Sequence, residues 1–232
     1  MVLVRVVASD GVEGWGEAWC NWPAVGAEHR ARLVADSGER LVGRGFADPG
    51  DVFRELDAAL QVLVLQTGEV GPIAQALAGI AIAVWDLVAR KRGLPLYRCL
   101  GAGPVESVPV YVTGLEPGRA GAVRARAAGG GPSRFQAQGR VRPGFGPAQP
   151  RGVARGPGGV GRAHGGRQPG ARAGRRFGGL LEFDRHPNAG RELVVASLLP
   201  VGRGHVPVPQ GAGIGAVPDI GALDRYRSWP PR

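Results

Sequence analysis

The side chains best suited to binding chemistry in this sequence lie close together in residues 18–30. Trp19 and Trp22 stand on either side of Asn21. In a loop, two indoles beside an amide could shield a small anion from water. The alternative is that both tryptophans only pack against the rest of the protein. The residues by themselves leave both interpretations open.

The elements before this segment must position it. Residues 2–8 are rich in β-branched side chains, Asp10-Gly11 offers a tight turn, and residues 14–19 can run back along the first segment. This pattern predicts an antiparallel β-hairpin.

Two helices and a strand are expected further along. Asp48-Pro49 is a favourable helix start, because Asp caps and Pro suits the first turn, and it predicts a helix near residues 50–65. Residues 72–92 give the strongest helical signal, with a basic end that suits the helix dipole and apolar residues on one face: Ile73, Leu77, Ile80, Val84 and Leu87. Polar residues interrupt this run, so we interpret it as a buried helix and not as a membrane span. Residues 107–113 (SVPVYVT) predict a short strand.

The charges of the chain are distributed unevenly. Residues 1–116 carry 10 Lys and Arg against 14 Asp and Glu, whereas residues 117–232 carry 19 Arg against 5 Asp and Glu. The second half also holds 26 of the 41 Gly, and residues 118–200 show neither helical nor strand periodicity. We therefore expect disorder there, and no parallel partner for the strand at 107–113.

Three ordered motifs carry a resemblance to a known family. Gly14-Trp15-Gly16-Glu17 follows the first strand and turn, residues 79–101 read GIAIAVWDLVARKRGLPLYRCLG, and residues 108–114 read VPVYVTG. Together they resemble the mandelate racemase/muconate lactonizing enzyme family of the enolase superfamily. One departure is Ala81, where the family usually has Asp. The resemblance implies an α+β capping domain (an antiparallel hairpin plus helices) followed by a truncated or disordered remnant of a (β/α)8 barrel.

The resemblance divides the chain into three parts. Residues 1–104 are expected to be the capping domain, without a first strand that relatives have before this start. Residues 105–117 are expected to be the first barrel strand, and residues 118–232 an Arg/Gly/Pro-rich remainder that is out of frame and largely disordered. A structural and not catalytic role is expected for four residues: Trp15, Glu17, Trp85 and Asp86.

The resemblance also implies a reaction. Members of the family abstract a proton alpha to a carboxylate, as racemases, cycloisomerases or acid-sugar dehydratases, with Mg²⁺ held by three acidic residues and often a Lys of a Lys-x-Lys motif as base. The implied substrate is a small carboxylate, contacted by Asn21 and Trp22 from a mobile loop at residues 18–30. An intact relative is expected to be a cytoplasmic homo-oligomer, without a membrane or a specific nucleic acid as partner. Cys20 and Cys99 make no disulfide framework, which agrees with a reducing compartment.

The residues for this chemistry are missing where the barrel should follow. Lys91 is the single lysine of the chain, and no carboxylate occurs from residue 117 to residue 181. We therefore expect this chain to have no catalytic residues, to bind no Mg²⁺ and to be inactive as written. Gly, Arg, Pro and Ala have GC-rich codons, so the composition is typical of a GC-rich gene read in a wrong frame.

A reading frame shifted forward by one base supports this hypothesis. The codons permitted by residues 135–143 then allow F-K-L-K-V-G-F-G-R, and those permitted by residues 162–169 allow A-L-M-V-D-A-N-Q. These resemble the Lys-x-Lys strand of the family and the Val-Asp-Ala-Asn strand that carries its first metal ligand. A third motif at residues 201–203 is less clear. Residues 217–227 resemble the family in the written frame, so we expect the frame to be restored near Gly204.

Two other functions fit parts of the sequence. An Arg-rich segment attracts phosphates, which would make the chain a basic-tail nucleic-acid binder. Against this, the segment has few aromatic residues for base stacking and no repeated Arg-Gly-Gly unit. The other alternative is a non-catalytic capping-domain protein. The barrel strand at residues 107–113 argues against it, because a lone cap has no use for that strand.

Overall fold

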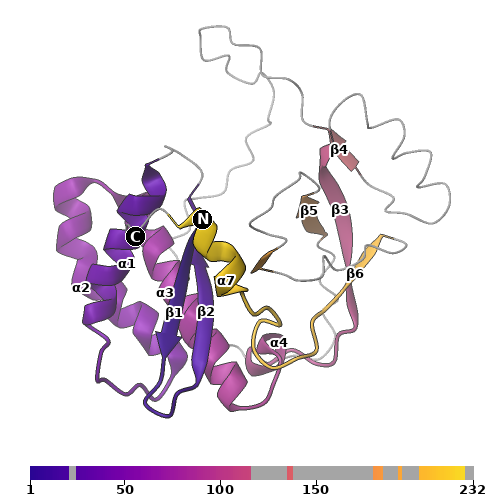
Figure 1. The fold of residues 1–232 in the computed structure, drawn as a ribbon, viewed down its shortest axis with the longest axis horizontal. Helices are drawn as coiled ribbons and strands as arrows, with labels where there is room; N and C mark the ends of the chain where they lie inside the picture. The colour runs from indigo at the N-terminus through magenta and orange to yellow at the C-terminus, as the bar shows by residue number, and fades with distance from the viewer. Residues whose placement is uncertain (21–24, 116–134, 138–179, 185–192, 195–203, 228–232) are drawn as a thin grey trace, which may run out of the picture. The chain divides into compact units, whose positions relative to one another are not determined.

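The computed structural model describes residues 1–20, 25–115, 135–137, 180–184, 193–194 and 204–227, and Figure 1 shows their helices and strands. The chain divides into two compact units. The first consists of Met1–Val108, Pro187–Val201 and His205–Arg232, and the second consists of Pro109–His186 and Gly202–Gly204.

The chain begins with the expected antiparallel hairpin. β1 (Val2–Val7) pairs with β2 (Glu13–Ala18), and Val4 lies opposite Gly16 in their register. The N–H of Ala8 donates to the carbonyl of Val12 at 2.9 Å and closes the turn. The hairpin predicted from the β-branched residues and the tight turn is confirmed.

The longer helices of the first unit are α1 (Gly26–Glu39), α2 (Pro49–Thr67) and α3 (Val70–Lys91), and a short helix, α4 (Leu96–Cys99), comes after them. The helices predicted near residues 50–65 and 72–92 are confirmed as α2 and α3. The Asp48 carboxylate accepts a hydrogen bond from Gly50 N at 2.6 Å, so this residue caps α2 as predicted.

Helix α1 was not predicted as an element with bounds, and it begins inside residues 18–30, where a mobile loop was expected. Residues 26–30 belong to the helix. Its signal in the sequence is weak because it has no side-chain cap, and because its buried side includes Gly26, Arg30 and Ser37 in place of large apolar residues.

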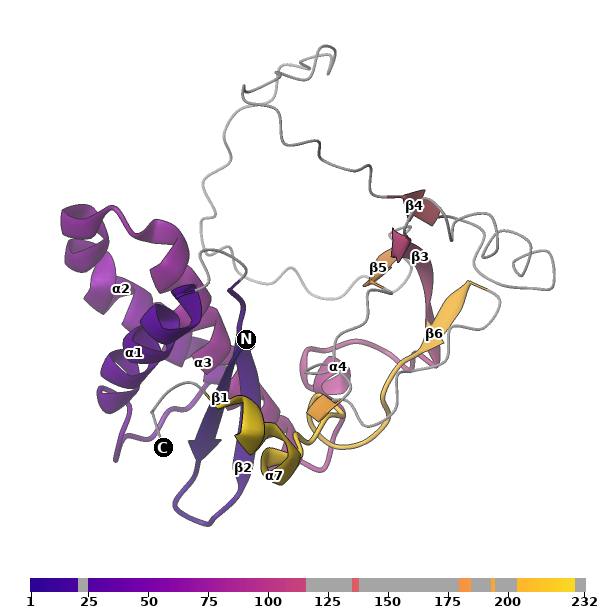
Figure 2. The same cartoon turned by 45° about the horizontal axis from the view of Figure 1, so that its top comes forward.

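The core of the first unit lies between the hairpin and the helices. Its buried members come from β1, α2 and α3: Val4, Val52, Leu56, Leu60, Ile73, Leu77, Ile80 and Ala83. Helix α3 is central, since both strands and helices α1 and α2 contact it, and Figures 1 and 2 show the hairpin lying along it. This close approach requires glycine in β2, because a Cβ on Gly16 would lie 2.7 Å from Ala83 N.

Helix α3 is the one described helix that is long and apolar enough to cross a membrane by length and composition. Its apolar window is 56 % buried inside the protein, which is the pattern of a core helix. This agrees with the interpretation of residues 72–92 as a buried helix.

Strand β3 (Ser107–Leu115) confirms the strand predicted at residues 107–113. It pairs in parallel with β4 (Phe135–Ala137) and with β5 (Leu181–Asp184). The expectation that this strand has no parallel partner is therefore wrong. Strand β5 reads LEFD, an alternation of apolar and polar residues over four positions, which is the shortest run that indicates a strand.

Residues 205–227 add further elements to the first unit: β6 (His205–Pro207), α7 (Ile220–Leu223) and the 3-10 turn η1 (Asp224–Tyr226). Asp219 caps α7, since its carboxylate accepts a hydrogen bond from Ala222 N at 2.9 Å. Most of the remainder of residues 118–232, for which disorder was expected, lies outside the described residues.

Candidate functional site

The two predicted substrate-contact residues, Asn21 and Trp22, lie outside the described residues. The chain on either side of them is described. Strand β2 ends at Ala18 and helix α1 begins at Gly26. The candidate site is therefore built from these two ends and from the part of α3 that holds them.

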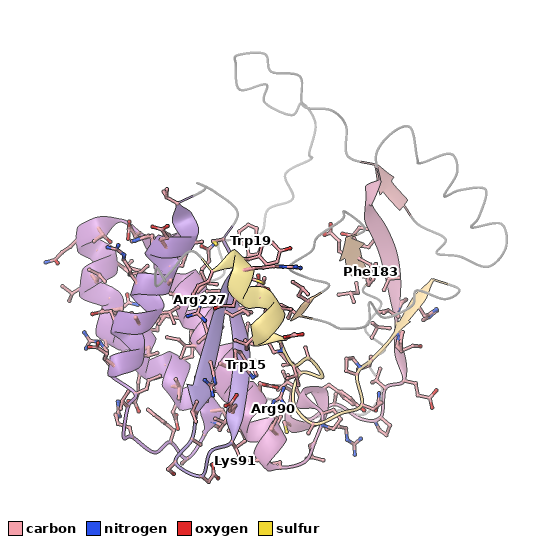
Figure 3. The ribbon with its side chains drawn as sticks, in the orientation of Figure 1. Trp15, Trp19, Arg90, Lys91, Phe183 and Arg227 are labelled. Atoms are coloured by element: carbon pink, nitrogen blue, oxygen red, sulfur yellow. The ribbon has the colours of Figure 1, made fainter. Side chains whose placement is uncertain are left out.

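The first end is fixed by a contact between small residues. Ala18 is fully buried (0 % exposed), and a Cβ added to Gly79 of α3 would lie 2.9 Å from the Cβ of Ala18. The next residue, Trp19, is 59 % exposed, and Figure 3 shows its side chain beyond the end of the strand. An exposed indole beside a firmly held strand end is available to a ligand.

The second end is fixed by a buried cation. Arg30 is 7 % exposed, and its guanidinium donates from Nη1 to the carbonyl of Gly26 at 3.1 Å and from Nε to Gln75 Oε1 at 2.8 Å. A buried charge is tolerated only with partners of this kind. One residue earlier, His29 Nε2 lies 2.8 Å from Glu69 Oε2. These contacts hold the start of α1 against the first half of α3.

The most buried acid of the first unit, Asp86 on α3, is surrounded by hydrogen-bond donors. Its side chain is 0 % exposed. Oδ2 accepts from Trp15 N at 2.8 Å and from Arg90 Nε at 2.7 Å, and Oδ1 accepts from Ile214 N at 2.7 Å. A carboxylate engaged by three donors joins a strand, a helix and the C-terminal segment, and it is not a free base.

The predicted structural roles are confirmed for two of the four residues. Trp15 is 8 % exposed in the hairpin, and Asp86 holds three elements together. Glu17 is exposed and Trp85 is half-buried, and their structural roles stay predictions.

Exposed charge pairs hold the hairpin at the surface. Lys91 Nζ lies 2.8 Å from Asp10 Oδ2, and its hydrogen bond is the main cause that lowers the pKa of Asp10 below the ordinary value. Arg5 pairs with Glu13 in the same way, and this hydrogen bond lowers the pKa of Glu13. Exposed pairs of this kind contribute little to stability, so we assign them an orienting role.

Two carboxylates stand on β5 in the second unit, Glu182 and Asp184. The hydroxyl of Tyr111 donates to Glu182 Oε2 at 3.0 Å, and this hydrogen bond raises the pKa of Tyr111 above its ordinary value. Within the part of the chain that the structure describes, no group of three His, Cys, Asp or Glu residues could hold a metal ion. The described residues therefore do not fit a Mg²⁺ site, which needs several oxygen ligands around one point.

Sequence reasoning missed the contacts that fix the candidate site. Arg30 and Gln75 are 45 positions apart, and Asp86 and Ile214 are 128 positions apart, so no local period marks either pair. One chemical signal was present, since an acid inside an apolar helix requires buried donors. That signal indicates that partners exist without saying where in the chain they are.

Known proteins resemble the N-terminal part of the chain. Residues 1–101 match the family model described as mandelate racemase / muconate lactonizing enzyme, N-terminal domain. The D-galactarolactone cycloisomerase of Agrobacterium fabrum is 34 % identical over 113 residues, which are 49 % of this chain and 28 % of that protein. The D-gluconate dehydratase of Thermoproteus tenax is 35 % identical over 116 residues, which are 49 % of this chain and 21 % of that protein.

A solved structure agrees with these matches. The mandelate racemase/muconate lactonizing enzyme from Bordetella bronchiseptica RB50 is 50 % identical, with a TM-score of 0.53, over 58 % of this chain and 37 % of that chain. The chain thus spans less than a third of the length of the two curated relatives. The hairpin, the three helices and these matches agree: residues 1–101 fold as a capping domain similar to the N-terminal domain of the mandelate racemase/muconate lactonizing enzyme family of the enolase superfamily.

Proposed function

We propose that this chain derives from a Mg²⁺-dependent enzyme that abstracts a proton alpha to the carboxylate of a small acid, and that the chain is inactive as written. The observation that carries the first half is the match of residues 1–101 to the N-terminal domain of the family. Its relatives include a sugar-acid dehydratase and a lactone cycloisomerase. Sugar acids are therefore the substrate class that we assign. Racemisation, cycloisomerisation and dehydration are compatible with the same capping domain.

Asn21 and Trp22 are the residues that we assign to substrate contact. Support comes from the two ends of their segment. Ala18 and Arg30 are buried against α3, whereas Trp19 is 59 % exposed. A short segment held at both ends by a rigid scaffold can close over a small ligand and exclude water.

Inactivity follows from the missing bases and metal ligands. A lysine is a common base in the family that this chain resembles, and no lysine follows Lys91 in this chain. From residue 117 to residue 181 there is no carboxylate, and an Arg guanidinium stays protonated and supplies no oxygen. In the second unit, the carboxylate of Glu182 is hydrogen-bonded to the Tyr111 hydroxyl. We therefore assign no catalytic step to this chain.

The domain boundaries follow from the same reasoning. We assign residues 1–104 to the capping domain and residues 105–117 to the first barrel strand. We place the change of reading frame after residue 117, where the carboxylates end. A cytoplasmic location fits the two free cysteines, Cys20 and Cys99.

Two measurements test this function. The purified full chain is incubated with D-gluconate, D-galactarolactone and 2-hydroxy acids, with and without Mg²⁺, beside the Thermoproteus tenax dehydratase as a positive control. We expect no turnover by the chain and no heat of Mg²⁺ binding, and Mg²⁺-dependent turnover would refute the inactivity. In the second measurement, residues 1–101 replace the capping domain of the Agrobacterium fabrum cycloisomerase. We expect turnover that Trp22→Ala lowers and the exposed control Val42→Ala does not, and a folded but inactive hybrid would refute the assignment.

A further inference from the structure

We propose that the out-of-frame part of this chain is confined to residues 118–179, and that residues 180–227 are again read in the frame of the capping domain. Residues 205–227, which we call the C-terminal clasp, contact that domain directly. This inference rests on the proposed function, because it takes the missing catalytic residues to result from a shifted frame. It places the restoration near Leu180, earlier than the position near Gly204 that the sequence indicated.

The composition of the chain changes abruptly after residue 179. Residues 118–179 hold 13 Arg, 19 Gly and no Asp or Glu, whereas residues 180–227 hold 5 Arg, 7 Gly and 5 Asp or Glu. The net charge is thus strongly positive in residues 118–179 and balanced in residues 180–227. A folded protein distributes both signs over its surface, so balanced charge is what a native frame produces.

The second support is the strand that begins directly after this change. Strand β5 pairs in parallel with β3 through four consecutive residues, from Leu181 opposite Val110 to Asp184 opposite Thr113. Its Glu182 also accepts the hydrogen bond from the Tyr111 hydroxyl at 3.0 Å. Backbone register and side-chain chemistry therefore agree, and such agreement across levels is the mark of a selected sequence.

The third support is the way residues 205–227 complete the first unit. The fully buried carboxylate of Asp86 accepts a hydrogen bond from Ile214 N. The backbone that follows α3 pairs with Gly213. The N–H of Gly213 donates to Leu94 O at 3.0 Å, and its carbonyl accepts from Leu96 N at 2.8 Å. Gly213 has φ +81°, and a Cβ there would overlap Asp86 Oδ1. Glycine is therefore the residue that fits at position 213 against the capping domain.

Side chains of other types make equally specific contacts. Arg90 Nη2 donates to the carbonyl of Ala216 at 2.8 Å. Gln210 accepts from the Tyr97 hydroxyl at 2.7 Å, and its amide donates to the carbonyl of Val105 at 3.0 Å. An out-of-frame translation is under no selection to satisfy these groups. A native frame explains all of them together.

The length of the shifted part fixes what it can contain. Between the end of β3 and the start of β5 lie residues 116–180, which are 65 residues. A strand with its crossover helix and the next strand takes about 30 residues or more, so this interval has room for about two such units. It includes both positions where a shifted frame resembles the family, residues 135–143 and 162–169. A closed eight-stranded barrel needs about 200 residues or more and does not fit there.

The coding DNA gives the first test. With one base shifted forward, codons 118–179 are expected to be free of stop codons and to encode Lys-x-Lys near codon 138 and Val-Asp-Ala-Asn near codon 166. The shift should be compensated near codon 180. A stop codon in the shifted frame within this interval would overturn the inference. This reading does not depend on activity, so it can fail while the assays of the proposed function succeed, and the reverse is equally possible.

Protein variants of the full chain give the second test. Gly213→Ala places a Cβ on Asp86 and forces a left-handed backbone, and we expect it to lower the Tm of the capping domain by about 5–15 °C. Gly211→Ala is the matched control, since nothing lies within 4 Å of a Cβ there. If Gly213→Ala does not fold, Gln210→Ala should still lower the Tm relative to the control. Equal Tm values for all three variants would show that the segment is not docked and would overturn the clasp.

Discussion

Replacement of the buried carboxylate of Asp86 by Ala is the sharpest test of how the capping domain is held together. In the native chain this carboxylate accepts hydrogen bonds from Trp15 N, Arg90 Nε and Ile214 N, at 2.7–2.8 Å. The substitution removes the acceptor for all three donors and leaves a small cavity in α3.

The expected cost follows from burial. A buried donor that loses its acceptor costs about 1–3 kcal/mol, and removal of one partner of a buried ion pair costs about 3–5 kcal/mol. The side chain of Arg90 is 21 % exposed and can turn towards water, which offsets part of the loss. We therefore expect Asp86→Ala to lower the free energy of unfolding by about 3–5 kcal/mol. This is a large part of the stability of a small domain, which is about 5–15 kcal/mol.

Urea unfolding of the full chain, followed by tryptophan fluorescence and by far-ultraviolet circular dichroism, measures this change. Asp57→Ala is the matched control, because it makes the same substitution at an exposed position of α2 and should change stability by less than about 0.5 kcal/mol. If Asp86→Ala is unfolded, Asp86→Asn should give an intermediate midpoint, since the amide keeps one acceptor oxygen. Midpoints for Asp86→Ala and Asp57→Ala that coincide would refute the reasoning.

Two further predictions concern the hairpin. Gly16→Ala should lower the free energy of unfolding by about 1–3 kcal/mol or more, because its Cβ meets the backbone of α3, whereas Gly103→Ala has open space around it; equal urea midpoints would contradict this. The pKa of Asp10 is lowered by its hydrogen bond from Lys91, so the stability from this pair is present above the ordinary pKa of 3.8 and is lost as the pH falls through the lower folded-state value. Asp10→Asn should therefore be less stable than the native chain at about pH 6 and should approach it as the pH falls further below 3.8, and a difference that grows on acidification would contradict the assigned sign.

Much of the first unit could be predicted because its signals are local. The turn at Asp10-Gly11, the cap at Asp48 and the apolar stripe of α3 each lie within a few residues of the structure that they specify. Helix α1 could not be predicted in this way. Its buried side includes Gly26 and Arg30, and burial of Arg30 depends on Gln75, 45 positions later.

The candidate site was less predictable than the fold. Asn21 and Trp22 were chosen by residue type and by resemblance, and both stay predictions because the structure describes the chain only on either side of them. The anchors of their segment were not foreseen, since they depend on a contact between Ala18 and Gly79 and on the partners of Arg30. Small residues in close contact leave no distinctive pattern in a sequence.

The energetics of the clasp explain how the capping domain can stay folded when the sequence of the barrel segment changes. The core of the first unit comes from β1, α2 and α3, all before residue 92. The clasp closes a loop between Val105 and Gln210, which are 105 positions apart. The entropy of loop closure depends on the logarithm of loop length, and doubling the length costs about 0.6 kcal/mol. It depends little on which residues fill the loop. The frame change that we propose within this loop would remove the bases and metal ligands, whereas the hydrogen bond from Ile214 N to Asp86 outside the loop is kept.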